Sequence, residues 1–297
     1  MSNPVVANIS CVWPAGRLLG EGPWWSERDA SLYWVDIKRP AILRYSPATG
    51  AMVEWPCPEP IGCCAPRRGT GMVVALESGF YTAELGPPGS PIAPEYLCTP
   101  PGLIAGDRFN DGKCHPDGSF WAGTMDDAER SARGWFYRLL PDRQIERIAG
   151  PYAVCNGPAF SPDGRVAYLT DSASRRVFRC ELGRARLSPE SFLLFGSADG
   201  YPDGMTVDTE GRLWIALWDG AKVVCVGPDG KRLLEITLPV SRPTSCAFGG
   251  PSLRTLYVSS ASIGLSEEQK LRESLAGGLF AIDLESVEGC PTSFFEG

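Results

Sequence analysis

The sequence predicts an all-β protein, a six-bladed β-propeller whose four-stranded antiparallel blades surround a central channel. Three observations predict this fold. A unit of about 45 residues recurs six times, a period typical of propeller blades. Each unit places a tight turn before an aromatic-rich strand. A further strand-like segment, VVANISCVW, precedes the first unit and can pair with the last blade. Residues 1–297 are therefore expected to form a single propeller domain.

The repeat is aligned on one residue per unit, here called the anchor position. Its occupants are Glu21, Gly62, Asn110, Asn156, Asp203 and Thr244, separated by 41, 48, 46, 47 and 41 residues. In the third, fourth and fifth units a glycine that closes a PDG or TEG turn follows the anchor by eight residues. The strands SFWAGTM, RVAYLTD and RLWIALW come next. A β-sandwich with coincidental turns is the alternative, but sandwiches do not repeat these features six times in one order.

The first, second and last units follow the same plan. EGPWWSERDASLYWVD leads into the strand AILRYSP, IGCCAPRRGTGMVVAL leads into ESGFYTAEL, and PTSCAFGGPSLRTLYVSS is followed later by GGLFAIDL. Residues 265–278, LSEEQKLRESLAGG, form the one segment with a helical pattern, which ends at glycine. We expect it to be an insertion outside the ring.

Composition excludes several classes of function. The net charge of −7 argues against binding to nucleic acid or to an anionic membrane surface. No uniform apolar run is long enough to span a bilayer, and the N-terminus lacks the pattern of a signal peptide. The eleven cysteines form no CxxC pair or disulfide framework, so reduced thiols and a cytoplasmic location are expected. A monomer is compatible with a closed ring.

The single histidine, His115, restricts the possible chemistry. Sites that need two or three histidine ligands are excluded. A Ser-His-Asp triad would have to use His115, which precedes a Pro-Asp-Gly turn and is better explained as an ordinary residue of that turn.

The anchor positions predict a site. Rotation about the propeller axis brings equivalent residues of different blades to one mouth of the channel. Glu21, Asn110, Asn156 and Asp203 would therefore converge there. Two carboxylates in a partly dry channel repel each other, and a divalent cation would relieve that repulsion. Oxygen ligands are compatible with Mg²⁺, Ca²⁺, Mn²⁺, Fe²⁺ or Zn²⁺. The alternative is that these side chains only cap turns at the strand starts.

Four motifs together resemble the regucalcin/gluconolactonase family of six-bladed propellers that hydrolyse sugar lactones. They are LGEGPWW, RFNDGKCHPDGSFWAGTM, NGPAFSPDGRVAYLTDS and YPDGMTVDTEGRLWIA, and the resemblance covers residues from about 17 to 285. It implies one divalent metal ion held by Glu21, Asn156 and Asp203. It also implies that Arg108 and Asn110 contact the substrate.

The sequence departs from the family pattern in two places. Asp126 and Asp127 follow the GTM motif, where the family commonly has longer glutamates, and we expect them to line the substrate pocket. Glu146 stands where the family often has a lysine. Asp171, in YLTDS, could orient a ligand from behind or simply cap a strand end. These changes affect the choice of substrate more than the chemistry.

The expected function is metal-dependent hydrolysis of an aldonolactone of the xylonolactone or gluconolactone type, giving the open-chain sugar acid. Asp203 is the candidate general base. Arg108, Asn110, Asp126 and Asp127 are the candidate substrate-binding residues. Two alternatives stay open, because fold alone does not decide function. One is a calcium-binding regulatory propeller without turnover, and the other is an esterase of broader specificity.

Overall fold

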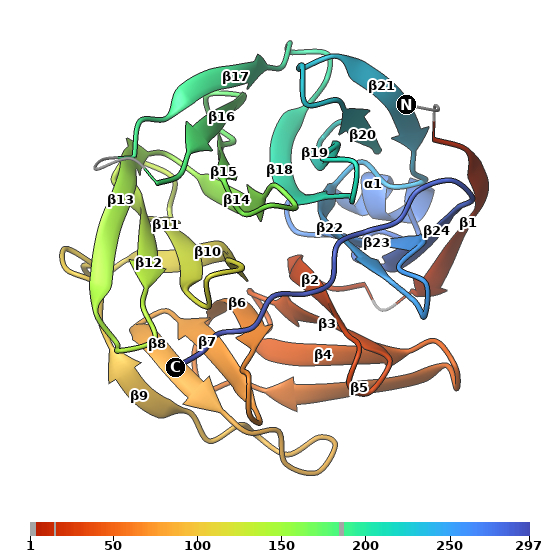
Figure 1. The fold of residues 1–297 in the computed structure, drawn as a ribbon. Helices are drawn as coiled ribbons and strands as arrows, with labels where there is room; N and C mark the ends of the chain where they lie inside the picture. Colours follow the sequence, from red (N-terminus) through yellow and green to blue (C-terminus); the bar gives the residue numbers. More distant parts are fainter. Residues whose placement is uncertain (1–3, 15, 184–186) are drawn as a thin grey trace.

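The computed structural model describes residues 4–14, 16–183 and 187–297 and confirms the predicted architecture. Six four-stranded antiparallel sheets are arranged as blades in a ring around a central channel (Figure 1). In each blade the strands follow one another in chain order from the axis outward, except in the sixth, which takes one strand from the N-terminus. The described chain is thus a six-bladed β-propeller.

The first three blades contain the strands predicted from the first three units. Blade 1 has β2 (Gly20–Ser26), β3 (Ser31–Asp36), β4 (Ala41–Ser46) and β5 (Ala51–Pro56). Blade 2 has β6 (Ile61–Pro66), β7 (Met72–Leu76), β8 (Gly79–Ala83) and β9 (Glu95–Cys98). Blade 3 has β10 (Asp107–Cys114), β11 (Phe120–Asp126), β12 (Gly134–Leu139) and β13 (Ile145–Tyr152).

The last three blades follow the same order. Blade 4 has β14 (Cys155–Phe160), β15 (Val166–Asp171), β16 (Arg176–Glu181) and β17 (Glu190–Leu194). Blade 5 has β18 (Tyr201–Val207), β19 (Leu213–Trp218), β20 (Lys222–Val226) and β21 (Arg232–Thr237). Blade 6 has β22 (Pro243–Gly249), β23 (Thr255–Ser260), β24 (Leu279–Leu284) and β1 (Val6–Trp13).

Burial decreases from the axis outward in every blade. The inner strands β2, β6, β14 and β22 are buried along nearly their whole length, whereas the outer strands β5, β13, β17 and β21 consist mostly of exposed or half-buried residues. Large apolar side chains fill the space between neighbouring blades, as with Trp214 and Phe248, whose rings meet edge to face. Most aromatic residues of the repeat therefore pack between blades.

The N-terminal strand closes the ring, as predicted. β1 pairs with β24 in antiparallel register, with Ile9 opposite Ile282 and Ser10 opposite Ala281. The Trp13 ring lies edge-on against Trp34 of blade 1, with 4.8 Å between ring centroids. Joining the two ends of the chain in one sheet covers the edge of β24 that an open ring would leave unpaired.

The helical segment is shorter than predicted. Only α1 (Glu267–Arg272) is helical, not residues 265–278. Ser266 caps it, and Gln269 completes a capping box, which sets the start. The chain must then turn back to reach β24, and Leu275 and Ala276 pack into the core instead of extending the helix. No residue of α1 is buried, so the helix lies on the protein surface as an insertion between β23 and β24.

A register irregularity occurs beside the anchor position of every inner strand. In blades 1, 3, 4 and 5 it falls between Glu21 and Trp24, between Phe109 and Gly112, between Asn156 and Ala159, and between Pro202 and Met205. Such bulges turn a strand's side chains away from the regular alternation. The repeat therefore carries both the anchor residue and the backbone irregularity next to it.

Blade 2 has glycine at its anchor position for a steric reason. A Cβ atom on Gly62 would lie 2.4 Å from the backbone carbon of Phe109 in the neighbouring inner strand. Only glycine allows this close approach. Blade 2 consequently contributes no side chain at this position, and blades 1 and 3 come close to each other near the axis.

The remaining expectations about composition concern cysteine, histidine and membrane spans. All eleven cysteines lie in the described chain, and none forms a disulfide. The His115 ring packs against Phe160, and its Nε2 lies 2.9 Å from the Gly164 carbonyl oxygen. These contacts agree with the interpretation of His115 as an ordinary residue of its turn. Within the described ranges no helix is long and apolar enough to cross a membrane.

Candidate functional site

Three anchor side chains come together in the interior near the axis. Glu21, Asn156 and Asp203 are only 2%, 3% and 5% exposed. Burial, followed by the charges of Asp203 and Asp111, raises the pKa of Glu21 well above its usual range. Burial and the charge of Asp111 likewise raise the pKa of Asp203. The neighbouring segments are in contact as well, because Asp111 accepts from the Gly157 N–H at 3.0 Å and Ser172 links the Asn156 amide to the Pro202 carbonyl.

Asp111 is a third buried carboxylate in this cluster, which the sequence reasoning missed. Its Oδ1 accepts a hydrogen bond from the Gly112 N–H at 2.7 Å, and its Oδ2 accepts one from the Gly157 N–H at 3.0 Å. Burial raises the pKa of Asp111 to about 6, although Lys113 opposes this shift. The Lys113 ammonium donates to the Met205 carbonyl at 2.8 Å. The motif FNDGK contained this signal, because it places a carboxylate directly after the Asn110 anchor.

One oxygen of the cluster has no partner. Asp203 Oδ1 is buried and makes no hydrogen bond to any described residue. An unpaired buried carboxylate oxygen is costly, and a bound cation would remove that cost. The oxygens of Glu21, Asn156 and Asp203 are the donor type that hard or borderline divalent cations take. These residues therefore fit such a cation.

The three candidate cation ligands, Glu21, Asn156 and Asp203, are not all titratable residues. Among the residues that the structure describes, no group of three or more His, Cys, Asp or Glu side chains is arranged to hold a metal ion. The candidate set differs because one of its three ligands is an amide oxygen. Its geometry therefore depends on how the Asn156 amide is oriented.

A chain of hydrogen bonds orients that amide. Asn110 Nδ2 donates to the Cys155 carbonyl at 2.9 Å and to Asn156 Oδ1 at 2.8 Å. At the other end, Ser172 Oγ donates to the Pro202 carbonyl at 2.6 Å and accepts from Asn156 Nδ2 at 2.8 Å. Because both carbonyl oxygens can only accept, the direction of every bond is determined. Asn156 Oδ1 therefore faces Asn110, and its second lone pair is available to a cation.

Replacing Ser172 with alanine is expected to weaken divalent cation binding by about 10- to 100-fold, the usual cost of losing a hydrogen bond that orients a ligand. The Asn156 amide would lose the acceptor that determines its orientation. Titration calorimetry with Ca²⁺ or Mn²⁺ measures the effect. Ser174→Ala is the matched control, because its hydroxyl contacts only the Asp171 carbonyl. Equal cation affinities of the two variants would contradict the assigned role of Ser172.

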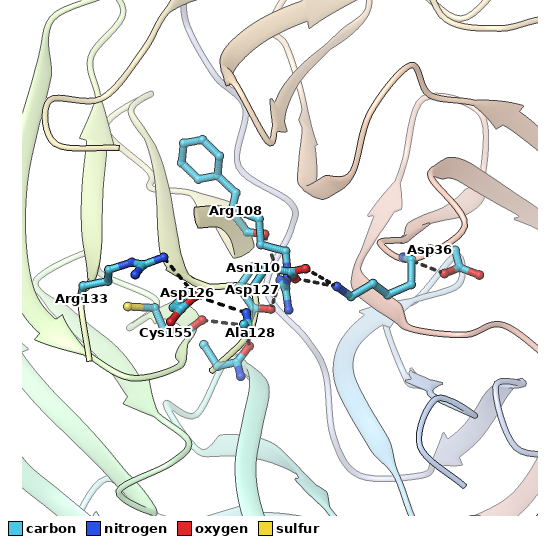
Figure 2. Close-up of polar contacts among 11 residues, drawn as sticks. Asp36, Arg108, Asn110, Asp126, Asp127, Ala128, Arg133 and Cys155 are labelled. Carbon is cyan, nitrogen blue, oxygen red and sulfur yellow. Dashed lines mark hydrogen bonds and ion pairs between the residues drawn. The ribbon is translucent and has the colours of Figure 1, made fainter. Parts of the chain in front are cut away.

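Arg108 and Asp127 lie beside Asn110, as Figure 2 shows. Arg108 is 5% exposed; its Nη1 donates to the Phe109 carbonyl and to Asn110 Oδ1, and its Nε donates to Asp127 Oδ1 at 2.5 Å. Its Nη2 group has no partner among the described residues. Arg108 can therefore still donate two hydrogen bonds to a bound molecule.

The two aspartates after the GTM motif have different surroundings. Asp126 is 1% exposed and accepts from the backbone N–H groups of Ala128 and Arg130, while Arg133 pairs with it at 3.0 Å. Its carboxylate thus holds its own loop together. The Asp127 side chain is 41% exposed, so it is the member of the pair that a substrate can reach.

Asp171 caps a chain segment. Its Oδ1 accepts a hydrogen bond from the Val154 N–H at 3.1 Å. Of the two roles considered for Asp171, this contact corresponds to capping and not to orienting a ligand. Its neighbour Ser172 is the residue of the YLTDS motif that reaches Asn156. Glu146 lies on β13 and pairs with Arg138 at 3.0 Å on the protein surface.

Most of this chain resembles a known protein family. Residues 19–262 match the SMP-30/Gluconolactonase/LRE-like region family. This chain belongs to that family. The expected relationship with regucalcin and the gluconolactonases is thereby confirmed. The matched residues cover blades 1 to 5, which contain all the candidate residues, and the strands β22 and β23 of blade 6.

Individual relatives cover nearly the full chain. The 6-deoxy-6-sulfogluconolactonase of Pseudomonas putida is 37% identical over 97% of this chain and 99% of its own length. The regucalcin of Oryctolagus cuniculus is 35% identical over 97% and 98%. Among solved structures, a luciferin-regenerating enzyme superposes with a TM-score of 0.90 at 28% identity, covering 99% of this chain and 100% of that one. This chain is similar to these proteins along its entire propeller.

Proposed function

We propose that this protein is a lactonase that hydrolyses an aldonolactone to the open-chain sugar acid, with one divalent cation held by Glu21, Asn156 and Asp203. The observation that carries the proposal is the unpartnered Asp203 Oδ1 within a buried cluster of carboxylates. Membership of the SMP-30/Gluconolactonase/LRE-like region family supports the proposal, as does the similarity to a 6-deoxy-6-sulfogluconolactonase.

The cluster can assist ester hydrolysis in two ways. A divalent cation bound there supplies Lewis-acid polarisation of the lactone carbonyl. The Asp203 carboxylate, which lies beside the attacking water in this proposal, takes a proton from it. Asp111 keeps the backbone before Pro158 in place through its bond to the Gly157 N–H, and so positions Asn156.

The substrate-binding residues have separate roles in this proposal. The free Nη2 group of Arg108 donates to a ring hydroxyl, and the exposed carboxylate of Asp127 accepts from one. Both amide protons of Asn110 already donate to other residues. Asn110 can therefore interact with a substrate hydroxyl only by accepting a hydrogen bond at Oδ1. Asp126 is committed to its loop and shapes the pocket indirectly. Pentose lactones of the xylonolactone type and hexose lactones of the gluconolactone type both present such hydroxyls.

Removal of the cation tests the proposal. The isolated protein is expected to release acid from xylonolactone or gluconolactone above the spontaneous rate. A chelator followed by dialysis is expected to lower that rate about tenfold or more, and re-addition of Mg²⁺, Ca²⁺, Mn²⁺, Fe²⁺ or Zn²⁺ singly identifies the ion that restores it. A pH-stat measures the acid released.

The same assay separates the alternatives. A protein that binds Ca²⁺ in calorimetry but releases no acid from either lactone would be a binding propeller without turnover. Faster hydrolysis of phenyl acetate than of the sugar lactones would identify an esterase of broader specificity. Chelator-insensitive lactone hydrolysis would remove the cation from the mechanism.

A further inference from the structure

Lys38 reaches Asp127 from the opposite side of the channel, although no sequence pattern pointed to it. It lies in the turn between β3 and β4 of blade 1. Its ammonium contacts Asp127 of blade 3, with Nζ 2.5 Å from Oδ1 and 2.8 Å from Oδ2. The Lys38 side chain is 27% exposed, so its ammonium is open to solvent beside Asp127. This contact joins two blades that are not neighbours in the ring.

A buried carboxylate holds the turn that carries Lys38. Asp36 is 0% exposed, and its Oδ1 accepts from the N–H groups of Lys38 and Arg39 at 3.2 and 3.1 Å. Its Oδ2 accepts from the Leu18 N–H at 3.1 Å, which ties the turn to the segment before β2. Figure 2 shows Asp36 on the side of the channel opposite Arg133 and Asp126. The backbone of the turn is therefore preorganised, and the ammonium is presented from a defined position.

Two cations share one carboxylate at this place. Arg108 Nε and Lys38 Nζ both contact Asp127 Oδ1. One carboxylate balances one cation, so these three groups together retain one positive charge. The nearby Asp107 and Asp126 are both buried and share the single cation Arg133, which balances one of their two negative charges. The donors that these groups leave over are one ammonium proton of Lys38 and the Arg108 Nη2 group.

We propose that Lys38 and Arg108 form a clamp for an oxyanion on the substrate, so that the preferred substrate is an aldonolactone with an anionic substituent away from the lactone carbonyl. This inference rests on the proposed lactonase activity. When the substrate binds, Lys38 exchanges Asp127 for the oxyanion, and Asp127 stays paired with Arg108. The exchange costs little, because an ion pair that is partly exposed to solvent contributes little to stability. A guanidinium and an ammonium are the side chains that bind sulfonate, carboxylate and phosphate oxygens best.

Substrate preference tests the clamp. At low ionic strength the wild-type protein is expected to show a kcat/KM at least about tenfold higher for 6-deoxy-6-sulfogluconolactone or glucarolactone than for gluconolactone, a difference that added salt reduces. The two anionic lactones tell whether a sulfonate or a carboxylate is preferred. Lys38→Gln is expected to lower the preference about fivefold or more, mainly through KM, and Lys38→Arg is expected to retain most of it.

Lys231→Gln is the matched control, because Lys231 lies on the exposed turn of blade 5 and contacts only Asp229, at 3.1 Å. It is expected to leave the preference unchanged. A wild-type protein without preference, or an equal loss on charged and neutral lactones in Lys38→Gln, would overturn the clamp and leave Lys38 as a strut between blades.

A binding measurement keeps this inference separate from the lactonase proposal. The ring sugars 6-deoxy-6-sulfoglucose and glucose have no ester, so calorimetry with them does not depend on turnover. Tighter binding of the sulfonated sugar to the wild type, lost in Lys38→Gln, supports the clamp even if no lactone is hydrolysed. Equal binding of both sugars by the wild type contradicts it.

Discussion

The Asp203→Asn variant is expected to lose about 10²- to 10⁴-fold in turnover of an aldonolactone, the usual contribution of a positioned general base. Asparagine keeps the shape and one oxygen donor but cannot take a proton from water. It also removes one negative charge from the site that would hold the cation. The measurement is kcat for acid release at saturating cation concentration, which separates the loss of the base from weaker cation binding.

The same substitution is expected to stabilise the cation-free fold. Burial and the charge of Asp111 make ionised Asp203 unfavourable, and a neutral amide does not bear that cost. The melting temperature of chelated Asp203→Asn at pH 7.5 should therefore lie above that of the chelated wild type. Asp229→Asn is the control, since Asp229 is on an exposed turn of the same blade. Near wild-type turnover in Asp203→Asn would remove Asp203 from the role of base.

The cation-free protein is expected to lose stability as the pH rises from 5 to 8. The pKa values of Glu21, Asp111 and Asp203 are raised in the folded state, that of Asp111 to about 6. Their contribution to stability is present below the unfolded pKa values near 4 and is lost as the pH rises through the folded ones. A decrease of several degrees in melting temperature is expected for a chain of this length.

Thermal unfolding of chelated protein at pH 5, 6, 7 and 8 measures this dependence. Saturating Ca²⁺ should flatten or reverse the slope, because a cation favours the ionised carboxylates. Asp111→Asn should reduce the slope without a cation. A melting temperature that rises between pH 5 and 8 in chelated protein would show that the three carboxylates do not form one repelling cluster.

The fold could be predicted because each blade repeats the same local pattern. Turn glycines, aromatic strands and the anchor spacing are local features, and the segment before Glu21 had no partner except the last blade. The length of α1 could not be predicted, because Leu275 and Ala276 leave the helix for contacts with distant strands. Such contacts override local helix propensity.

The candidate site was predicted only in part. Glu21, Asn156 and Asp203 could be chosen because they share a repeat position, and the structure brings them together. Ser172 and Lys38 occupy no shared position, so no pattern pointed to them, whereas Asp111 was missed although the motif FNDGK places it directly after the Asn110 anchor. Asn110 was expected to bind the substrate, but both of its amide protons are used by Cys155 and Asn156.

The sequence by itself determined the number of blades, the closure of the ring by its first strand and the shared repeat position of the oxygen donors. These follow from a periodic pattern, since rotation about one axis converts equal spacing along the chain into convergence in space. Only the tertiary structure decided which donor atoms stay unpaired, how the Asn156 amide is turned and which charges meet across the channel. Those properties depend on hydrogen bonds and ion pairs between residues far apart in the chain, such as Lys38 and Asp127, which are separated by 89 positions, and no local pattern specifies them.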